Sequence, residues 1–416
     1  MITTLKARLN GRFSWRQTFT ALRYPNYRLW FWGQMISLFG SWMQGTAQGY
    51  LMFELTRSPA FLGYVGFANG VPVWLFMLYA GVVADRIPRR RLMIITQSAM
   101  MLLAFATAGL TFAHLIKPWH IIVLAFGFGA ANAFDAPARQ AIVNELVPTE
   151  DVTNAIALNS AMFNTATAIG PAVGGVTYSL FGPGWCFVIN GLSFIAVIAA
   201  LGAMKLAPFV PRPRGNSVVE DLKEGVTYVA THVLIRTLVG LVAVISLFGF
   251  AFVVLVPAWA VNILHGNAAT NGLLQASRGF GALAAALLIA SLGRFRFKGA
   301  LISLGSVAFP LLLIAFAFVR WQPLAHLTLV GVGFALILVF NLANASVQTL
   351  TPPELRGRVM SIYSLTFFGL LPIGALVIGW TASRLGEPTA VVLNAGVTLA
   401  FALLLLAFVP RLRRQE

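Results

Sequence analysis

The chain has 416 residues, of which 58% are apolar and 10% charged, and its mean hydropathy is +0.82. A soluble domain of this length would lack the polar surface that water requires, so the composition predicts an integral membrane protein. The net charge of +17 does not indicate nucleic-acid binding, because the positive residues are spread over short gaps between apolar segments, where lipid head groups are their expected partners.

Twelve apolar segments divide the chain, each close to the roughly 20 residues that cross a bilayer as a helix. A longer interruption at 205–235 contains three prolines and an amphipathic stretch, which predicts a cytoplasmic linker with a surface helix. The linker separates two six-helix groups, 29–204 and 236–409. The predicted spans are 29–53, 60–84, 92–114, 119–143, 153–181, 184–204, 236–264, 269–292, 299–319, 324–348, 357–383 and 388–409.

The gaps between these segments alternate between basic and nearly uncharged. Most of the 29 Lys and Arg residues fall on one side, together with the N-terminal arm (1–28), the linker and the tail (410–416). Cytoplasmic loops retain positive residues, so both termini are predicted to be cytoplasmic. The basic arm leads directly into a run long enough to span, so no cleavable signal peptide is expected. The remaining basic residues are Arg57, Lys117, Arg320, Arg384 and, within an apolar segment, Arg278.

An internal repeat is visible at an offset of 204 positions, which relates Glu150 to Glu354. The string Leu146–Glu150 matches Leu350–Glu354, and Gly170 aligns with Gly374. In both copies the acidic residue stands where a loop turns into the fifth helix of its half, and there it complements the helix dipole. Six helices are an even number, so the two halves are predicted to share topology and to be related by an axis along the membrane normal.

The loop between spans two and three reads Gly81-Val82-Val83-Ala84-Asp85-Arg86-Ile87-Pro88-Arg89-Arg90-Arg91. This string resembles the G-x-x-x-D-R-x-x-R-R signature of the major facilitator superfamily, and the resemblance covers essentially the whole chain. It implies an all-α integral membrane protein with twelve transmembrane helices in two six-helix bundles, the major facilitator fold. It also implies a conformational latch in this loop; the alternative is a plain positively charged loop. The implied latch residues are Gly81, Asp85, Arg86, Arg89 and Arg90, with Arg294 and Lys298 in the second half, where the loop has no acid.

Span five contains Gly170, Pro171, Gly174 and Gly175, which resemble the G-P-x-x-G-G core associated with exporters of this superfamily. Proline bends a membrane helix and glycine lets a neighbouring helix approach closely, so the segment is predicted to form a pliable seam between the halves. The resemblance implies export. The alternative is that Gly and Pro are simply frequent in membrane helices.

Four further strings resemble the branch that contains enterobactin exporters and macrolide efflux proteins. The superfamily's usual basic residue deep in span four is missing, and Arg139 stands near the cytoplasmic end instead. The proton-coupling scheme of the family therefore does not transfer residue by residue. The strings are Gly33–Leu38 with Trp42–Gln44, Leu55–Pro59, Phe134–Gln140 and Asn154–Ser160.

Span one carries a polar stripe at intervals of three and four residues, which places its members on one helical face. Such a stripe turns inward, where it lines a water-filled path or bonds to adjacent helices; we favour lining. The stripe consists of Gln34, Ser37, Ser41, Gln44 and Gln48. Further candidate lining residues are Asn69, Gln97, Asn132, Asn262, Gln275, Asn341 and Asn344.

Two ionisable residues lie well inside the predicted spans, Asp135 and Arg278, and isolated charge in a membrane indicates a partner or a function. For Asp135 the alternatives are a reversible proton carrier and an ion pair with Arg139 one turn later. For Arg278 the alternatives are that it binds an anionic group of the cargo, or that it pairs with another residue or extends toward the lipid head groups.

These features predict a proton-coupled exporter of amphipathic small molecules, such as siderophores or drugs, that works by alternating access as a monomer in the bacterial inner membrane. Lipids and protons are the other expected partners, and no cofactor is expected. A single cysteine, Cys186, and five scattered histidines argue against a metal site, and the lack of a phosphate-binding loop argues against a nucleotide motor. The sequence shows no paired intramembrane carboxylates, His-rich metal site or Ser-His constellation, which argues against an enzyme. The alternatives are uptake, lipid flipping or metal-ion export by the same fold, or a non-transporting sensor.

Overall fold

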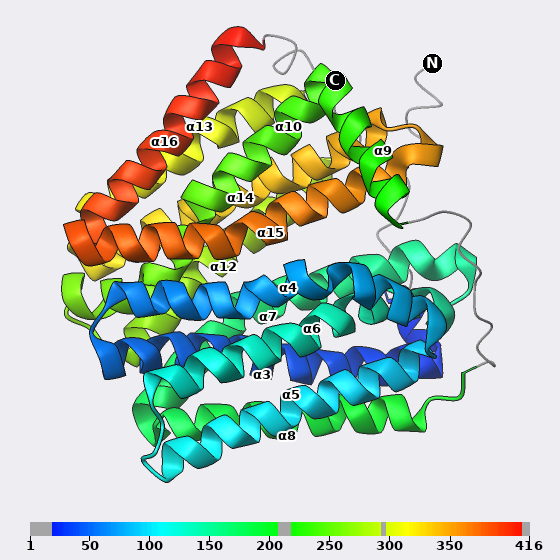
Figure 1. Cartoon of the computed structure of the whole chain (residues 1–416), viewed down its shortest axis with the longest axis horizontal. Helices are drawn as coiled ribbons and strands as arrows, with labels where there is room; N and C mark the ends of the chain where they lie inside the picture. Colours follow the sequence, from blue (N-terminus) through cyan, green and yellow to red (C-terminus); the bar gives the residue numbers. More distant parts are fainter. Residues whose placement is uncertain (1–18, 207–217, 293–296, 410–416) are drawn as a thin grey trace, which may run out of the picture.

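A computed structural model of the chain describes residues 19–206, 218–292 and 297–409. Two groups of helices lie one above the other (Figure 1). The first group consists of α3 (Pro25–Thr56), α4 (Pro59–Arg86), α5 (Arg89–Phe112), α6 (Pro118–Leu146), α7 (Val152–Phe181) and α8 (Pro183–Ala203). The second contains α10 (Val233–Val244), η3 (Ile245–Gly249), η4 (Phe250–Leu255), α11 (Val256–Ala258), η5 (Trp259–Ile263), α12 (Ala268–Leu292), α13 (Lys298–Phe318), α14 (Gln322–Leu350), α15 (Pro353–Leu385) and α16 (Glu387–Phe408).

Proline fixes the start of several of these helices. Helices α3, α4, α6, α8 and α15 each begin with a proline, whose missing N–H costs nothing in the first turn. Helix α3 therefore begins at Pro25, inside the stretch assigned above to the N-terminal arm. The residue before it, Tyr24, donates a hydrogen bond of 2.7 Å to Asp151, which raises the pKa of the tyrosine hydroxyl and ties the entry of α3 to the start of α7.

Ten of the described helical segments are long and apolar enough to cross a membrane. Helices α3 and α7, with 32 and 30 residues, are long enough but are not among the ten. Each carries several polar residues, which lower its hydropathy. The seventh predicted span is continuous from Val233 to Ile263 but changes helix type repeatedly, with π-helical stretches at η3 and η5.

The predicted surface helix of the linker is α9 (Val218–Thr231), a strongly amphipathic helix. It packs against the beginning of α15, where Glu224 pairs with Arg358 and Gly225 lies against the Arg358 backbone. Helix α9 is thus held against the second group rather than between the two.

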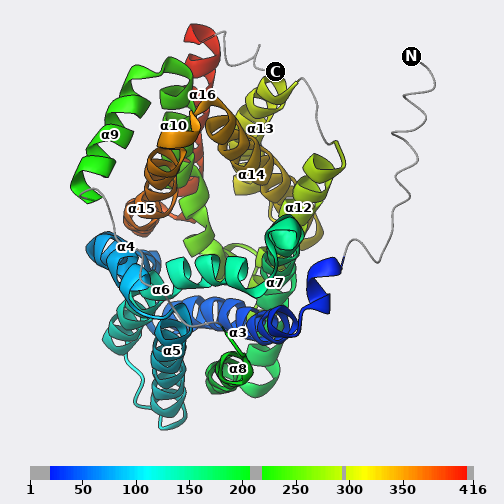
Figure 2. The same cartoon turned by 90° about the vertical axis from the view of Figure 1, so that its right-hand side faces the viewer.

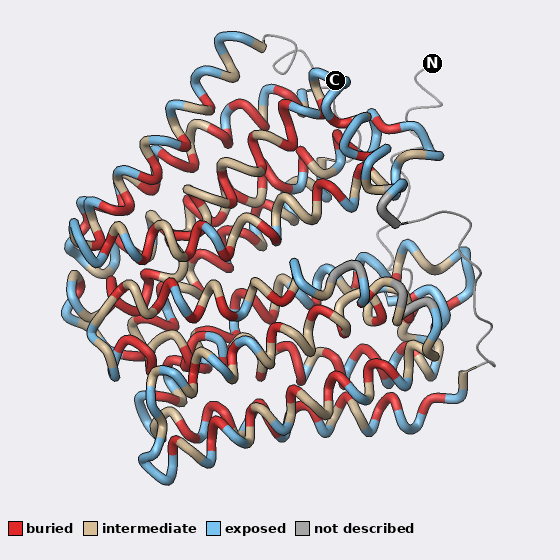
Figure 3. Tube along the Cα trace, in the orientation of Figure 1, coloured by how far each residue is buried: buried red, intermediate tan, exposed pale blue. Residues whose placement is uncertain are grey.

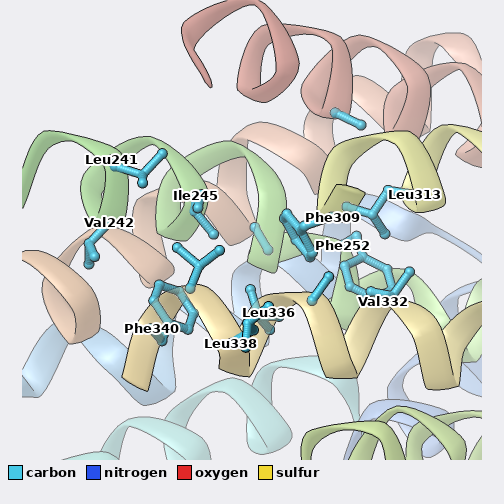
Figure 4. Packing of buried hydrophobic residues seen from close by; sticks show 14 of the residues in the cluster. Leu241, Val242, Ile245, Phe252, Phe309, Leu313, Val332, Leu336, Leu338 and Phe340 are labelled. Atoms are coloured by element: carbon cyan, nitrogen blue, oxygen red, sulfur yellow. The ribbon is translucent and has the colours of Figure 1, made fainter. Parts of the chain in front are cut away.

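Each of the two groups has its own packed interior. Buried residues lie toward the middle of each group and exposed ones along the outside (Figure 3). In the second group Leu241, Ile245, Phe309 and Phe340 belong to one buried cluster (Figure 4). Large exposed side chains on the outside, such as Phe318 and Phe408, suit contact with lipid, where close packing rather than water exclusion holds helices together.

The internal repeat is visible in the packing of two aligned glycines. A Cβ added at Gly170 would lie 2.6 Å from the Trp42 Cβ atom in α3. A Cβ added at Gly374 would lie 2.3 Å from the Leu247 carbonyl oxygen in η3. In both halves the fifth helix therefore meets the first through the aligned glycine, as the duplication predicts.

Candidate transport site

The two halves meet along two helix pairs, α7 with α12 and α4 with α15, which lie side by side in Figure 2. Where α7 crosses α12, a Cβ added at Gly175 would lie 2.9 Å from the Gly272 Cα atom. Farther along, one added at Gly279 would lie 2.6 Å from the Ala168 Cα atom. The Ala269 N–H donates to the Ser179 hydroxyl at 3.0 Å. Small residues thus let the two backbones touch.

The pair α4–α15 is built in the same way. A Cβ added at Gly379 would lie 3.0 Å from the Gly63 Cα atom, and one added at Gly70 would lie 2.2 Å from Pro372. Nearer the middle of the helices, the Trp74 indole N–H donates to the Gly369 carbonyl at 2.8 Å.

These contacts lie at one end of the molecule and in its middle. We call the end where α3 passes into α4 the α3–α4 end, and the opposite end, which carries α9, the α9 end. Gly63 and Gly379 lie at the α3–α4 end, as do Gly175 and Gly272. Toward the α9 end the two groups of helices diverge (Figure 1). The halves are therefore closed against each other at the α3–α4 end.

Polar side chains are exposed toward the α9 end. Helix α14 ends there and exposes Asn341 and Gln348, with Asn344 half-buried and accepting a hydrogen bond of 2.6 Å from Gln348. Helix α7 begins there and exposes Ser160, with Asn164 half-buried. Polar faces on membrane helices need water or polar partners, so these faces indicate a polar environment toward the α9 end.

The exporter-type motif of α7 contacts two different neighbours. Added Cβ atoms at Gly170 and Gly174 would meet α3, at 2.6 Å from Trp42 and 2.8 Å from the Met43 carbonyl oxygen. Gly175 faces α12 in the other half, and an added Cβ at Gly272 would lie 2.3 Å from the Pro171 carbonyl oxygen. The motif thus lies at the seam between the halves, whereas its pliability stays a prediction.

The polar stripe of α3 is mostly buried. Gln34, Ser37, Gln44 and Gln48 are at most 9% exposed, and Ser41 is half-buried. Gln44 accepts a hydrogen bond of 2.7 Å from Asn190 in α8. In this conformation these four side chains pack between helices rather than along an open path, and their lining role stays a prediction.

The other candidate lining residues are scattered. Gln97 is buried, and Gln275 donates to Asn271 at 3.1 Å. Asn262 donates to Glu387 at 2.7 Å near the α3–α4 end, away from the polar faces described above. Among the rest, Asn69 and Asn341 are exposed and Asn132 and Asn344 are half-buried.

Asp135 lies between α5 and α6 and is 1% exposed. The Thr96 hydroxyl donates to its carboxylate at 2.8 Å, and the Gln97 amide at 3.0 Å. The Arg139 guanidinium forms an ion pair with it at 3.5 Å. The ion pair that the sequence offered as one alternative is therefore present, with two hydrogen bonds that the sequence did not indicate.

Arg278 lies near the middle of α12 and is 5% exposed. Its guanidinium carbon is 5.4 Å from the centroid of the Phe250 ring, and its Nε atom is buried without a hydrogen-bond partner. Phe250 belongs to an aromatic cluster with Phe340 and Phe367. No sequence pattern pointed to this cluster, because its members come from η4, α14 and α15.

The predicted latch is partly described. Arg89 pairs with Glu145 at the end of α6, and Arg90 donates to the Gly202 and Met204 carbonyls at the end of α8. Arg86 is exposed, and Gly81 and Lys298 are half-buried. The Asp85 side chain and Arg294 lie outside the described residues. The partner Glu145 was missed, since nothing in the sequence relates it to the loop.

The geometry is that of a multi-pass membrane transporter, with two helical bundles that meet at one end. The family model MFS_3, described as "Transmembrane secretion effector", matches residues 16–416, so the chain belongs to this family of the major facilitator superfamily. The family predicted from the sequence motifs is thereby confirmed.

Several characterised proteins resemble the chain at the sequence level. The Staphyloferrin A transporter of Staphylococcus aureus is 24% identical over 83% of this chain and 87% of its own length. The Enterobactin exporter EntS of Citrobacter koseri is 24% identical over 97% of each chain. Macrolide efflux protein A of Streptococcus pyogenes is 24% identical over 88% of this chain and 92% of its own. The predicted branch is confirmed by these similarities.

A solved structure shares the fold. The bacterial homologue of the human lysosomal transporter Spinster, in an inward-facing and unoccupied conformation, superimposes with a TM-score of 0.71. It is 14% identical, and the match covers 96% of this chain and 99% of that one. At this identity the likeness concerns the fold alone.

Proposed function

We propose that the chain is a proton-coupled exporter of amphipathic small molecules that works by alternating access in the bacterial inner membrane. The observation that carries the proposal is the closure of both helix pairs at the α3–α4 end, combined with exposed polar faces toward the α9 end. In a carrier that opens to one side of the membrane at a time, the two halves are in contact at one end and apart at the other in each state.

We further propose that α3 and α7 also span the membrane, which gives twelve spans and places both termini in the cytoplasm. Both helices are long enough and pack along neighbours that are apolar enough to cross. Basic residues around the α9 end support a cytoplasmic position for it. The structure then corresponds to the inward-facing state.

Export rather than uptake is supported by the exporter-type G-P-x-x-G-G motif at the seam and by relatives named as exporters or efflux proteins. Siderophore and drug cargoes are the classes that those names carry. Proton coupling is supported by Asp135, the one buried carboxylate among the N-terminal bundle's residues whose side chains are described, with a cation beside it.

The test is transport in proteoliposomes that contain the purified full chain and an imposed pH gradient. Radiolabelled enterobactin, ferric staphyloferrin A and erythromycin serve as probe cargoes, and empty liposomes serve as the control. Gradient-driven movement of at least one cargo, with saturable counterflow, is expected. Binding without counterflow would favour a sensor, and counterflow that ignores the pH gradient would exclude proton coupling.

A further inference from the structure

Arg278 is a buried cation for which the described part of the chain supplies no acidic partner. The guanidinium forms neither an ion pair nor a hydrogen bond with any described residue, and its Nε atom is sealed from solvent. The acids whose side chains are not described, Asp85, Asp221 and Glu416, stand beside a helix end or the chain end. Arg278 lies roughly 20 Å along α12 from the helix end at Leu292. An unpaired charge at this depth indicates a function.

The position of Arg278 on α12 points it toward the space between the halves. It follows Asn271 and Gln275 at intervals of four and three residues, so the three share one face. Asn271 reaches across to the other half, where its amide donates to the Thr46 carbonyl at 3.5 Å. The outward face of α12 carries exposed Phe280 instead.

Aromatic rings extend from Arg278 to an exposed surface. Phe250, which lies under the guanidinium, stacks on Phe367 at 6.1 Å between centroids. Phe367 in turn contacts Phe368 at 4.7 Å, and Phe368 is 56% exposed. Phe368 stands seven residues before Ala375, which meets α4 of the other half, so the exposed ring lies on the side of α15 that faces the other half.

We propose that Arg278 binds an acidic oxygen group of the cargo, while an aromatic or flat apolar part of the same molecule packs on Phe250, Phe367 and Phe368. A guanidinium is planar and always charged, and it donates paired hydrogen bonds to a carboxylate or phenolate. The inference rests on the proposed transport function and adds the charge of its cargo. A cargo that carries a cation at this position meets an unpaired positive charge and is rejected.

The experiment measures equilibrium binding of two probes of equal size and opposite charge to the full chain in detergent. The probes are 2-naphthoate and 2-naphthylmethylammonium. The variants are Arg278→Gln, Arg278→Lys and Phe250→Leu. The matched control is Arg384→Gln, which removes another arginine that lies over an aromatic ring, 6.0 Å from the Trp380 centroid, but is exposed.

We expect saturable binding of the carboxylate by the parent protein, at least tenfold weaker in Arg278→Gln, partly restored in Arg278→Lys and unchanged in Arg384→Gln. Phe250→Leu is expected to weaken it about threefold. The ammonium probe is expected not to bind. Arg278→Gln is expected to fold, because it removes an unpaired buried charge; its melting temperature should not fall below that of the parent.

The proposal is overturned if the parent shows no saturable binding of 2-naphthoate, if it prefers the ammonium probe, or if Arg278→Gln binds the carboxylate as tightly as the parent. Gradient-driven transport of any cargo by the parent chain would still stand in these cases, so failure of this inference is separate from failure of the proposed function.

Discussion

Gly175 and Gly272 lie backbone to backbone where α7 crosses α12, and a Cβ added to either would approach the other's Cα atom within 2.9 Å. This contact joins the exporter-type motif of one half to the first turns of α12 in the other. In the proposed alternating-access cycle this contact breaks in every turn, so its tightness contributes to the balance between the two states.

The first prediction concerns this crossing. Gly272→Val should hold the halves apart at the α3–α4 end, because backbone atoms of Pro171 and Gly175 occupy the space that the side chain needs. Transport is expected to fall at least tenfold with the amount of folded protein retained. Cross-linking between cysteines placed at Ser179 and Ala269, in a Cys186→Ala background, is expected to fall as well.

The control for this variant is Gly109→Ala, because an added Cβ at Gly109 in α5 meets nothing within 4 Å. Normal cross-linking in Gly272→Val would show that a side chain fits where α7 crosses α12. It would contradict the claim that transport requires close contact between these two helices.

A second prediction concerns the other helix pair. Trp74→Phe removes the indole N–H that bonds to the Gly369 carbonyl but keeps most of the ring. A hydrogen bond of this kind contributes about 1 kcal/mol, which corresponds to about a fivefold shift in the equilibrium between the two states. Accessibility of a cysteine at Gln348, at the α9 end, should fall by up to that factor. An unchanged labelling rate would mean that the bond is equally strong in both states.

The apolar helical segments could be predicted from the sequence because hydropathy and helix-start prolines are local signals. The structure also agrees with the alignment of Gly170 and Gly374, because each glycine contacts the first helical segment of its own half. The hydrogen-bond partners of the α3 stripe could not be predicted. Periodicity shows that Gln44 shares a face with Gln34, but not that α8 supplies Asn190 opposite it.

The surroundings of Arg278 could not be predicted from the sequence either. Phe250 and Phe367 are far apart in the chain, and only the folded second half brings them together beside Arg278. The break of the seventh span into π-helical and 3-10 stretches, which places Phe250, has no local period that predicts it.

A third prediction separates two arginines in the first turn of α5, Arg90 and Arg91. Arg90→Gln should lower stability, because Arg90 donates to the last carbonyls of α8, which have no partner within that helix. The loss is expected to be about 1 to 2 kcal/mol, seen as a lower melting temperature in detergent. Arg91→Gln is the control, since Arg91 is exposed. Equal melting of the two variants would contradict the capping role.

A fourth prediction concerns Asp85 in the predicted latch loop. If the family's latch operates here, Asp85→Asn impairs transport at least tenfold while the melting temperature stays within about one degree of the parent. Flux into inverted vesicles and melting of the same preparation are the two measurements. Undiminished flux would mean that the loop only helps to orient the protein in the membrane, which its positive charge alone predicts.

The last prediction tests whether Asp135 carries the proton. In Asp135→Asn the ion pair with Arg139 is lost, whereas the amide oxygen still accepts hydrogen bonds from Thr96 and Gln97. If the carboxylate is the carrier, the variant retains counterflow but no longer responds to an imposed pH gradient. Arg139→Gln is the comparison, because it breaks the same ion pair and keeps the carboxylate. A gradient response lost only in Asp135→Asn assigns the proton to Asp135, whereas parallel loss in both variants assigns the ion pair a structural role.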